Sequence, residues 1–127
     1  MPQPPDIVLL GADWRSRALI RAQLIEEGFE VVATDNWPTM RRHLRPGAKP
    51  RLAIVDLQGL PDPAGVLKGL RALMKPDRVL VLSALGTVDP ADIQRLGFDC
   101  IARPVAMKDL VTKTAQAIRS VAPEGHD

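Results

Sequence analysis

The sequence of 127 residues is poor in cysteine, in aromatic side chains and in net charge. Its one cysteine, Cys100, excludes an internal disulfide and any Cys-x-x-Cys metal or redox motif. Aromatic residues make up 3% of the chain and tyrosine is absent, which argues against a platform that stacks nucleobases. The 17 basic and 15 acidic residues leave a formal charge of +2, too little for a strong field toward nucleic acid. We therefore expect no nucleic-acid partner.

Long apolar runs are missing as well. No uncharged apolar run approaches the ~20 residues that cross a bilayer. The first residues, Met1–Asp6, are polar and do not form a basic and apolar leader. These absences predict a cytoplasmic protein without a membrane partner. Apolar residues at 46% and charged residues at 25% are typical of a globular domain, so we predict a single domain over residues 1–127 with its core between 7 and 121.

Short apolar runs alternate with helical patterns along the whole chain. Unbroken apolar runs predict strands that are buried on both faces of a parallel sheet. Cap residues, and prolines in the first helical turn, predict where helices begin. The expected strands are Ile7–Leu10, Phe29–Thr34, Leu52–Asp56, Val79–Ser83 and Cys100–Ala102. The expected helices follow Asp13, either Asp35 or Asn36, Asp62 and Asp89, with apolar stripes at Ala18, Ala22 and Ile25 in the first helix and at Leu110, Val111, Thr114, Ile118 and Val121 in the last.

Five β-α units in this order predict an α/β fold. It is a doubly wound, five-stranded parallel sheet flanked by five helices that cover both of its faces. Ligands of such sheets bind at the carboxyl ends of the strands. The residues expected at those ends are Gly11–Asp13, Asp56–Leu57, Ser83–Ala84 and Arg103–Pro104.

The motifs of common α/β enzymes are absent. The sequence has no Gly-x-Gly-x-x-Gly, no phosphate-binding P-loop and no Gly-x-Ser-x-Gly, and its histidines, His43 and His126, fall in a helix and in a tail. We therefore expect no enzymatic activity, and a small enzyme of unrelated chemistry is disfavoured because no second catalytic group accompanies Asp56. At the end of the third strand, Asp56 has two interpretations: a nucleophile that accepts a phosphoryl group, or a cap of the following loop.

The order and spacing of several short motifs resemble a bacterial response-regulator receiver domain over Ile7–Val121. The motifs are Ile54–Leu57, the loop Gly59–Gly65, Leu82–Ala84, Leu96–Gly97 and Arg103–Pro104, with Arg17 and Glu27–Phe29 also matching. The resemblance implies a flavodoxin-like sheet of strand order 2-1-3-4-5. It also implies signal transduction in a two-component phosphorelay.

In that family the aspartate that matches Asp56 is phosphorylated by a histidine kinase or a phosphotransfer protein. The resemblance makes Asp56 the phosphoacceptor and places Ser83 and Arg103 on the phosphoryl oxygens. Cys100 stands at the aromatic switch position, and the Arg103–Pro104 peptide is expected to be cis, as the matching Lys-Pro peptide is. Contacts with a downstream protein, or with a second copy in a homodimer, are implied for the fourth helix, fifth strand and fifth helix, about Asp89–Val121.

Three departures from the family pattern affect the site. The acidic pair that holds magnesium aligns with Gly11 and Ala12, so we expect weak magnesium binding through Asp13 and Asp56. Arg103 replaces lysine and either binds phosphate or forms a standing ion pair with Asp56. Cys100 lacks the aromatic ring of the switch. Two functions follow: a receiver impaired in phosphorylation that acts through protein contacts, or a phosphorylation-independent pseudo-receiver that docks or dimerises constitutively.

Two further features keep more than one interpretation. A basic stretch beside His43 is either a solvated helix face, which the low net charge favours, or a nucleic-acid contact. It consists of Arg41, Arg42, Arg45, Lys49 and Arg51. Trp14 and Trp37 either mark a partner surface or, for Trp14, cover the space left by the missing carboxylates.

Overall fold

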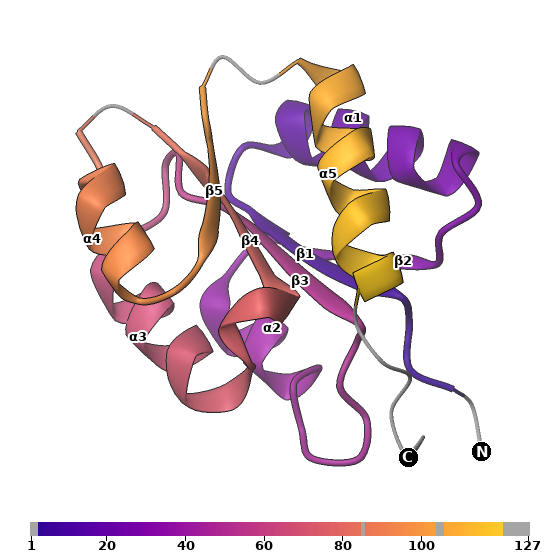
Figure 1. Ribbon diagram of the computed structural model, residues 1–127, viewed down its shortest axis with the longest axis horizontal. Helices are drawn as coiled ribbons and strands as arrows, with labels where there is room; N and C mark the ends of the chain where they lie inside the picture. The colour runs from indigo at the N-terminus through magenta and orange to yellow at the C-terminus, as the bar shows by residue number, and fades with distance from the viewer. Residues whose placement is uncertain (1–2, 85, 104–105, 121–127) are drawn as a thin grey trace.

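The computed structural model describes residues 3–84, 86–103 and 106–120, and Figure 1 shows how its layers are arranged. Five parallel strands form one sheet in the order β2-β1-β3-β4-β5. The strands are β1 (Ile7–Gly11), β2 (Val31–Thr34), β3 (Leu52–Asp56), β4 (Val79–Ser83) and β5 (Asp99–Ala102). The predicted α/β class, the parallel sheet and its strand order are confirmed. The second strand is shorter than expected, because Phe29 and Glu30 precede the paired residues.

Five α-helices connect and flank the strands. They are α1 (Trp14–Glu26), α2 (Trp37–Arg42), α3 (Pro63–Leu73), α4 (Pro90–Arg95) and α5 (Met107–Ser120), and a 3-10 helix, η1 (Pro76–Arg78), precedes β4. The side chains of the four predicted cap residues each accept a hydrogen bond from a backbone amide of the first turn. None of the helices in the described part of the chain is both long and apolar enough to cross a membrane.

Two apolar cores lie on opposite faces of the sheet. Neighbouring strand residues point to opposite faces, so Val8 packs in the core with α2, α3 and α4 while Leu9 packs in the core with α1 and α5. Figure 1 shows the same division, with α1 and α5 on one side of the sheet and the other helices across it. Because both faces are covered, the carboxyl edge of the strands is where polar groups can gather.

The apolar residues that recur at helical spacing in the first helix point to solvent. Ala18, Ala22 and Ile25 are exposed, and the residues of α1 that pack on the sheet are Ile20 and Leu24. The spacing identified the helix but not its buried side, because α1 carries apolar residues on two sides and hydrophobic periodicity alone does not say which side is buried.

The last helix buries its predicted stripe and one polar group with it. Leu110, Thr114 and Ile118 of α5 are buried and Val111 is half-buried, while Val121 lies outside the described residues. Among the buried side chains that the structure describes, the Thr114 hydroxyl has no hydrogen-bond partner. A buried hydroxyl without a partner costs free energy, because it has given up its hydrogen bonds to water.

We expect Thr114→Val to raise the free energy of unfolding by about 1 kcal/mol, since valine has nearly the same shape and no hydroxyl to desolvate. Urea unfolding followed by circular dichroism measures the change. Thr112→Val is the matched control: Thr112 is exposed on the same helix, so its substitution should alter stability by less than about 0.5 kcal/mol. A destabilised Thr114→Val protein would contradict the prediction.

Candidate functional site

The parallel register brings three strand ends together at one edge of the sheet. Gly11 of β1 is the pairing partner of Asp56 of β3. Beyond the paired residues, the Leu57 amide donates to the Leu82 carbonyl at 3.0 Å, and the Arg103 amide donates to the Ser83 carbonyl at 3.3 Å. These bonds extend the ladder to its carboxyl edge, which places Arg103, directly after β5, within reach of Asp56 across the end of β4.

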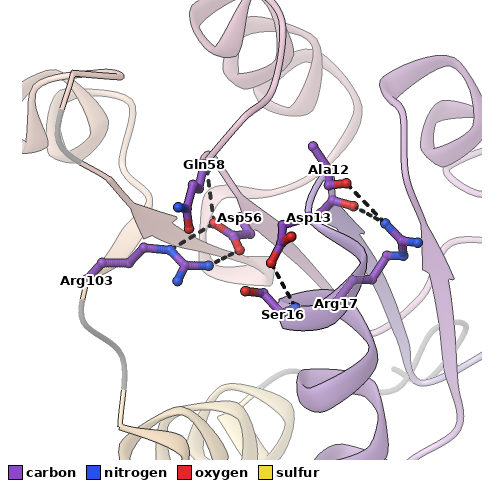
Figure 2. A network of polar contacts seen from close by, with 8 residues as sticks. Ala12, Asp13, Ser16, Arg17, Asp56, Gln58 and Arg103 are labelled. Atoms are coloured by element: carbon purple, nitrogen blue, oxygen red, sulfur yellow. Dashed lines mark hydrogen bonds and ion pairs between the residues drawn. The ribbon is translucent and has the colours of Figure 1, made fainter.

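Arg103 and Asp56 form an ion pair at this edge (Figure 2). The Arg103 Nε donates to Asp56 Oδ1 at 3.2 Å, and its Nη2 donates to Oδ2. The Asp56 side chain is 3% exposed and that of Arg103 is 24% exposed. The Gln58 backbone amide also donates to Asp56 Oδ1, at 3.1 Å. Both carboxylate oxygens therefore accept hydrogen bonds from protein groups. Asp56 is at once the partner of Arg103 in an ion pair and a cap of the following loop.

The sequence left open whether Asp56 caps the following loop and whether Arg103 forms an ion pair with it, and the structure contains both interactions. Ser83, the expected phosphate-binding hydroxyl, is buried at 5% exposure and lines a cavity of about 260 Å³. Arg103 lines the same cavity, together with Thr87 and Asp89 from the β4–α4 connection. Ser83, Arg103 and Asp56 thus meet at one strand edge. Cys100 is half-buried against the core under α2, α3 and α4, and Pro104 lies outside the described residues, so the cis prediction is left as a prediction.

Asp13, the second expected metal ligand, is engaged in capping α1. Its Oδ2 accepts a hydrogen bond from the Ser16 amide at 3.0 Å (Figure 2). Gly11 and Ala12 have no carboxylate, and Arg17 Nη1 donates to the carbonyls of both residues, at 2.7 and 3.5 Å. Across the described residues, no group of three His, Cys, Asp or Glu side chains is placed to hold a metal ion. The donor set does not fit magnesium, because both oxygens of Asp56 face a cation already.

Two contacts in the site were not specified from the sequence, which named Arg17 only as a match to the family pattern and gave the loop cap of Asp56 without its donor. Arg17 fixes the β1–α1 connection by donating to backbone carbonyls of that connection, and the Gln58 backbone amide donates to the Asp56 carboxylate. A lone arginine in a helix gives no signal that it will reach back six residues, and a backbone amide gives none at all. Only the fold brings these groups to the carboxyl edge.

The two tryptophans lie in different environments. Trp14 is 62% exposed, and the Arg15 guanidinium lies 5.4 Å from the centre of its ring. The ring is therefore not a buried cover of the site. Trp37 is half-buried beside α3, where a Cβ on Gly69 would come within 2.4 Å of its ring. The packing of Trp37 accounts for it without a partner.

Comparison with known proteins shows that solved receiver domains share the fold of this chain. No protein-family model matches the sequence, and no curated protein matches it. Many solved structures do match. The signal receiver domain of a LuxO repressor protein from Vibrio parahaemolyticus aligns over 92% of both chains, at 21% identity and a TM-score of 0.76. The chain has the receiver-domain fold.

Two other receiver-fold structures give the same result. The receiver domain of NtrX from Brucella abortus matches 91% of this chain and 99% of its own, at 23% identity and a TM-score of 0.76. Full-length FixJ from B. japonicum matches 96% of this chain at 25% identity and a TM-score of 0.77. This chain spans 61% of FixJ, so the rest of FixJ has no counterpart in the alignment.

The charge of Asp13 is stabilised by its role as a cap. Hydrogen bonds from the side chain and backbone of Ser16 lower the pKa of the Asp13 carboxyl, and the guanidinium groups of Arg103 and Arg15 lower it further. A carboxyl whose pKa is lower in the folded state stabilises the fold above its unfolded pKa, near 4. That stabilisation is lost as the pH falls through the folded pKa.

We expect Asp13→Ala to lower stability at pH 7 and to lower it less at pH 3, because the advantage of the charged cap shrinks once the pH is below the unfolded pKa near 4. Urea unfolding midpoints of both proteins at the two pH values measure the difference. Asp13→Asn is the control, because asparagine also caps a helix but does not titrate. A stability gap between wild type and Asp13→Ala that is equal at both pH values would contradict the assignment.

Removing Arg103 should leave a buried carboxylate without its cation. We expect Arg103→Gln to cost about 2 kcal/mol, below the range for fully buried pairs because the Arg103 side chain keeps 24% exposure. Asp56→Asn in the Arg103→Gln background should recover part of that loss, which a double-mutant cycle measures by urea unfolding. Arg95→Gln is the matched control, since its ion pair with Asp92 is largely exposed and should be worth about 0.5 kcal/mol or less. Equal costs for the two arginines would refute the structural role of the buried pair.

Proposed function

We propose that this chain is a receiver-like signalling module that acts through protein–protein contacts without phosphorylation. The observation that carries the proposal is the Arg103 guanidinium on both oxygens of Asp56. Transfer of a phosphoryl group to a carboxylate requires a free nucleophilic oxygen and a cation that neutralises the phosphoryl charge. Here the oxygens accept hydrogen bonds from Arg103 and from the Gln58 backbone amide, and within the described residues no group of three His, Cys, Asp or Glu side chains is placed to hold a metal ion. Asp56 then serves as an anchor of the carboxyl edge.

The outward face of α1 supports a function in protein contacts. Trp14 is 62% exposed and Ile25 is 42% exposed, and they share one face of the helix with Ala18 and Ala22 at spacings of three and four residues. Exposed apolar patches of this kind mark interaction sites, and tryptophan is enriched among the residues that anchor them. A histidine kinase, a phosphotransfer protein or a downstream protein is the class of partner that the receiver fold suggests.

A second candidate function is an impaired phosphoacceptor at Asp56. The buried Ser83 favours it, since this hydroxyl lines a cavity of about 260 Å³ together with Arg103, beside the carboxylate. For a phosphoryl group to bind there, the Arg103 side chain would have to leave Asp56 and contact the phosphoryl oxygens instead. Arginine is suited to that contact through its two parallel donors. The face formed by α4, β5 and α5 would then carry the change to a partner or to a second copy.

An amide NMR titration with magnesium, followed by beryllofluoride as an acyl-phosphate mimic, separates the two functions. We expect no shifts at Asp56, Ser83 or Arg103 at millimolar concentrations, because the ion pair closes the site. Shifts that start at these residues and spread into β5 would refute the proposal and establish the second candidate.

A variant that restores the groups of the family pattern shows whether an absence of chemical-shift changes in the wild type is a property of its site. Gly11→Asp, Ala12→Asp and Arg103→Lys combined put two carboxylates beside Asp56 and remove the guanidinium. The Gly11 position can accept a side chain, since an added Cβ would lie 3.5 Å from Arg17 Cβ and 3.8 Å from Asp56 Cβ. We expect this variant to show magnesium-dependent shifts that the wild type lacks.

A further inference from the structure

The small net charge conceals a strong separation of charge along the chain. Residues 41–78 contain nine basic and three acidic residues, a net charge of +6, and the rest of the chain contains eight basic and twelve acidic residues, a net charge of −4. Two of those three acidic residues lie at the carboxyl edge of the sheet, since Asp56 ends β3 and Asp62 directly precedes α3. Away from the carboxyl edge of the sheet, the charged residues of this segment are therefore mainly basic.

The fold joins two groups of basic residues that are separate in the sequence. Lys49, in the α2–β3 connection, donates to the Leu73 carbonyl at the end of α3 at 2.5 Å, so this connection lies against the carboxyl end of α3. Trp37 at the start of α2 packs on Gly69 of α3, which holds the helices side by side, as Figure 1 shows. We name this surface the basic end and define it by Arg41, Arg42, Arg45, Arg51, Arg71 and Lys75, all exposed.

The positive charges of the basic end are available to a partner. Within the described residues, none of the six forms an ion pair with a carboxylate. Arg41, Arg42 and Arg71 lie in the last turns of α2 and α3, where they also stabilise the helix dipoles. Arg51 and Lys75 lie in connections outside those helices, so helix stability does not account for them. Asp77, in η1, is the acidic residue of the adjacent connection and offsets one charge.

The basic end lacks the apolar centre that a protein partner would bury. Protein interfaces combine aromatic and apolar anchors with a polar rim. The large exposed apolar side chains in the described part of this chain are Trp14, Leu19 and Ile25, and all three belong to α1. Five of the six residues of the basic end are arginines, whose planar forks bind phosphate through two donors. A surface of arginines without apolar anchors fits a polyphosphate backbone.

We propose that the basic end binds the phosphate backbone of double-stranded DNA without reading its bases. Trp37 packs on α3, so no exposed aromatic ring of the basic end is available to stack the bases of a single strand. Duplex DNA instead presents one charge per about 1.7 Å and binds proteins by release of its counterions. The expectation of no nucleic-acid partner rested on the net charge, which does not register this concentration. The proposal is independent of the chemistry at Asp56.

Fluorescence anisotropy of the full chain with a labelled mixed-sequence DNA duplex tests the proposal. We expect a Kd in the range of about 10⁻⁶ to 10⁻⁴ M that weakens steeply between about 50 and 200 mM salt. A variant with Arg42→Gln, Arg45→Gln, Arg71→Gln and Lys75→Gln should bind at least about tenfold more weakly and lose about 0.9 in the slope of log K against log salt for each phosphate contact removed.

The matched control removes the same charge elsewhere, through Arg21→Gln, Arg95→Gln, Lys108→Gln and Arg119→Gln. It should keep most of the affinity and of the salt slope. Equal weakening by the two variants would overturn the proposal, because net charge alone would then explain binding. Absence of binding to the duplex at low salt would also overturn it. So would poly-glutamate or phosphatidylglycerol vesicles that displace the labelled duplex as effectively as unlabelled duplex does at the same concentration of charge. Circular dichroism confirms that both variants are folded.

Discussion

The ion pair between Arg103 and Asp56 is the interaction on which the carboxyl edge of this sheet depends. A parallel sheet covered on both faces delivers the Asp56 carboxylate to a place where it is 3% exposed, and a buried charge requires a partner. Receiver domains, by the resemblance, balance several carboxylates with a metal ion and a lysine. With Gly11 and Ala12 at the acidic positions, Asp56 is left as the buried carboxylate of the strand ends, and the Arg103 guanidinium neutralises it. Against the family pattern that the resemblance implies, the absent acidic pair and the arginine in place of lysine together keep the charge at this edge balanced.

Most of the fold could be predicted because local signals agreed with one another. Apolar runs marked the strands, and the cap residues marked four helix starts. Strand order came from the resemblance, since periodicity says nothing about neighbours in a sheet. The burial of α1 could not be predicted, because Ala18 and Ile25 form as regular a stripe as Ile20 and Leu24. In the site, the sequence placed Asp56 and Ser83 at strand ends and Asp13 at the cap of the first helix, but the position of the Arg103 fork depends on side-chain geometry that no spacing encodes.

The same ambiguity of α1 has a physical use. A helix that packs one apolar side on a sheet gains stability from that side alone, and a second apolar side exposed to water adds nothing to folding. Burial in the core therefore does not account for Trp14 and Ile25 on the outer side. A polar side would serve the domain equally well, which makes a protein contact the physical explanation that requires fewest additional features. Because α1 begins directly after Asp13, such a contact would lie next to the closed site and need not open it.

Net charge is a poor guide to what such a domain binds, because screening limits the distance over which charges cancel. The Debye length is about 8 Å at physiological salt, whereas the 11 residues of α3 extend over about 16 Å. Carboxylates at the amino end of α3, such as Asp62, therefore cancel little of the field at its carboxyl end. A partner that approaches Arg71 and Lys75 meets the local charge of the basic end and not the +2 of the whole chain. The fold thus separates an apolar helix face from a cationic end, and the two surfaces suit partners of different chemistry.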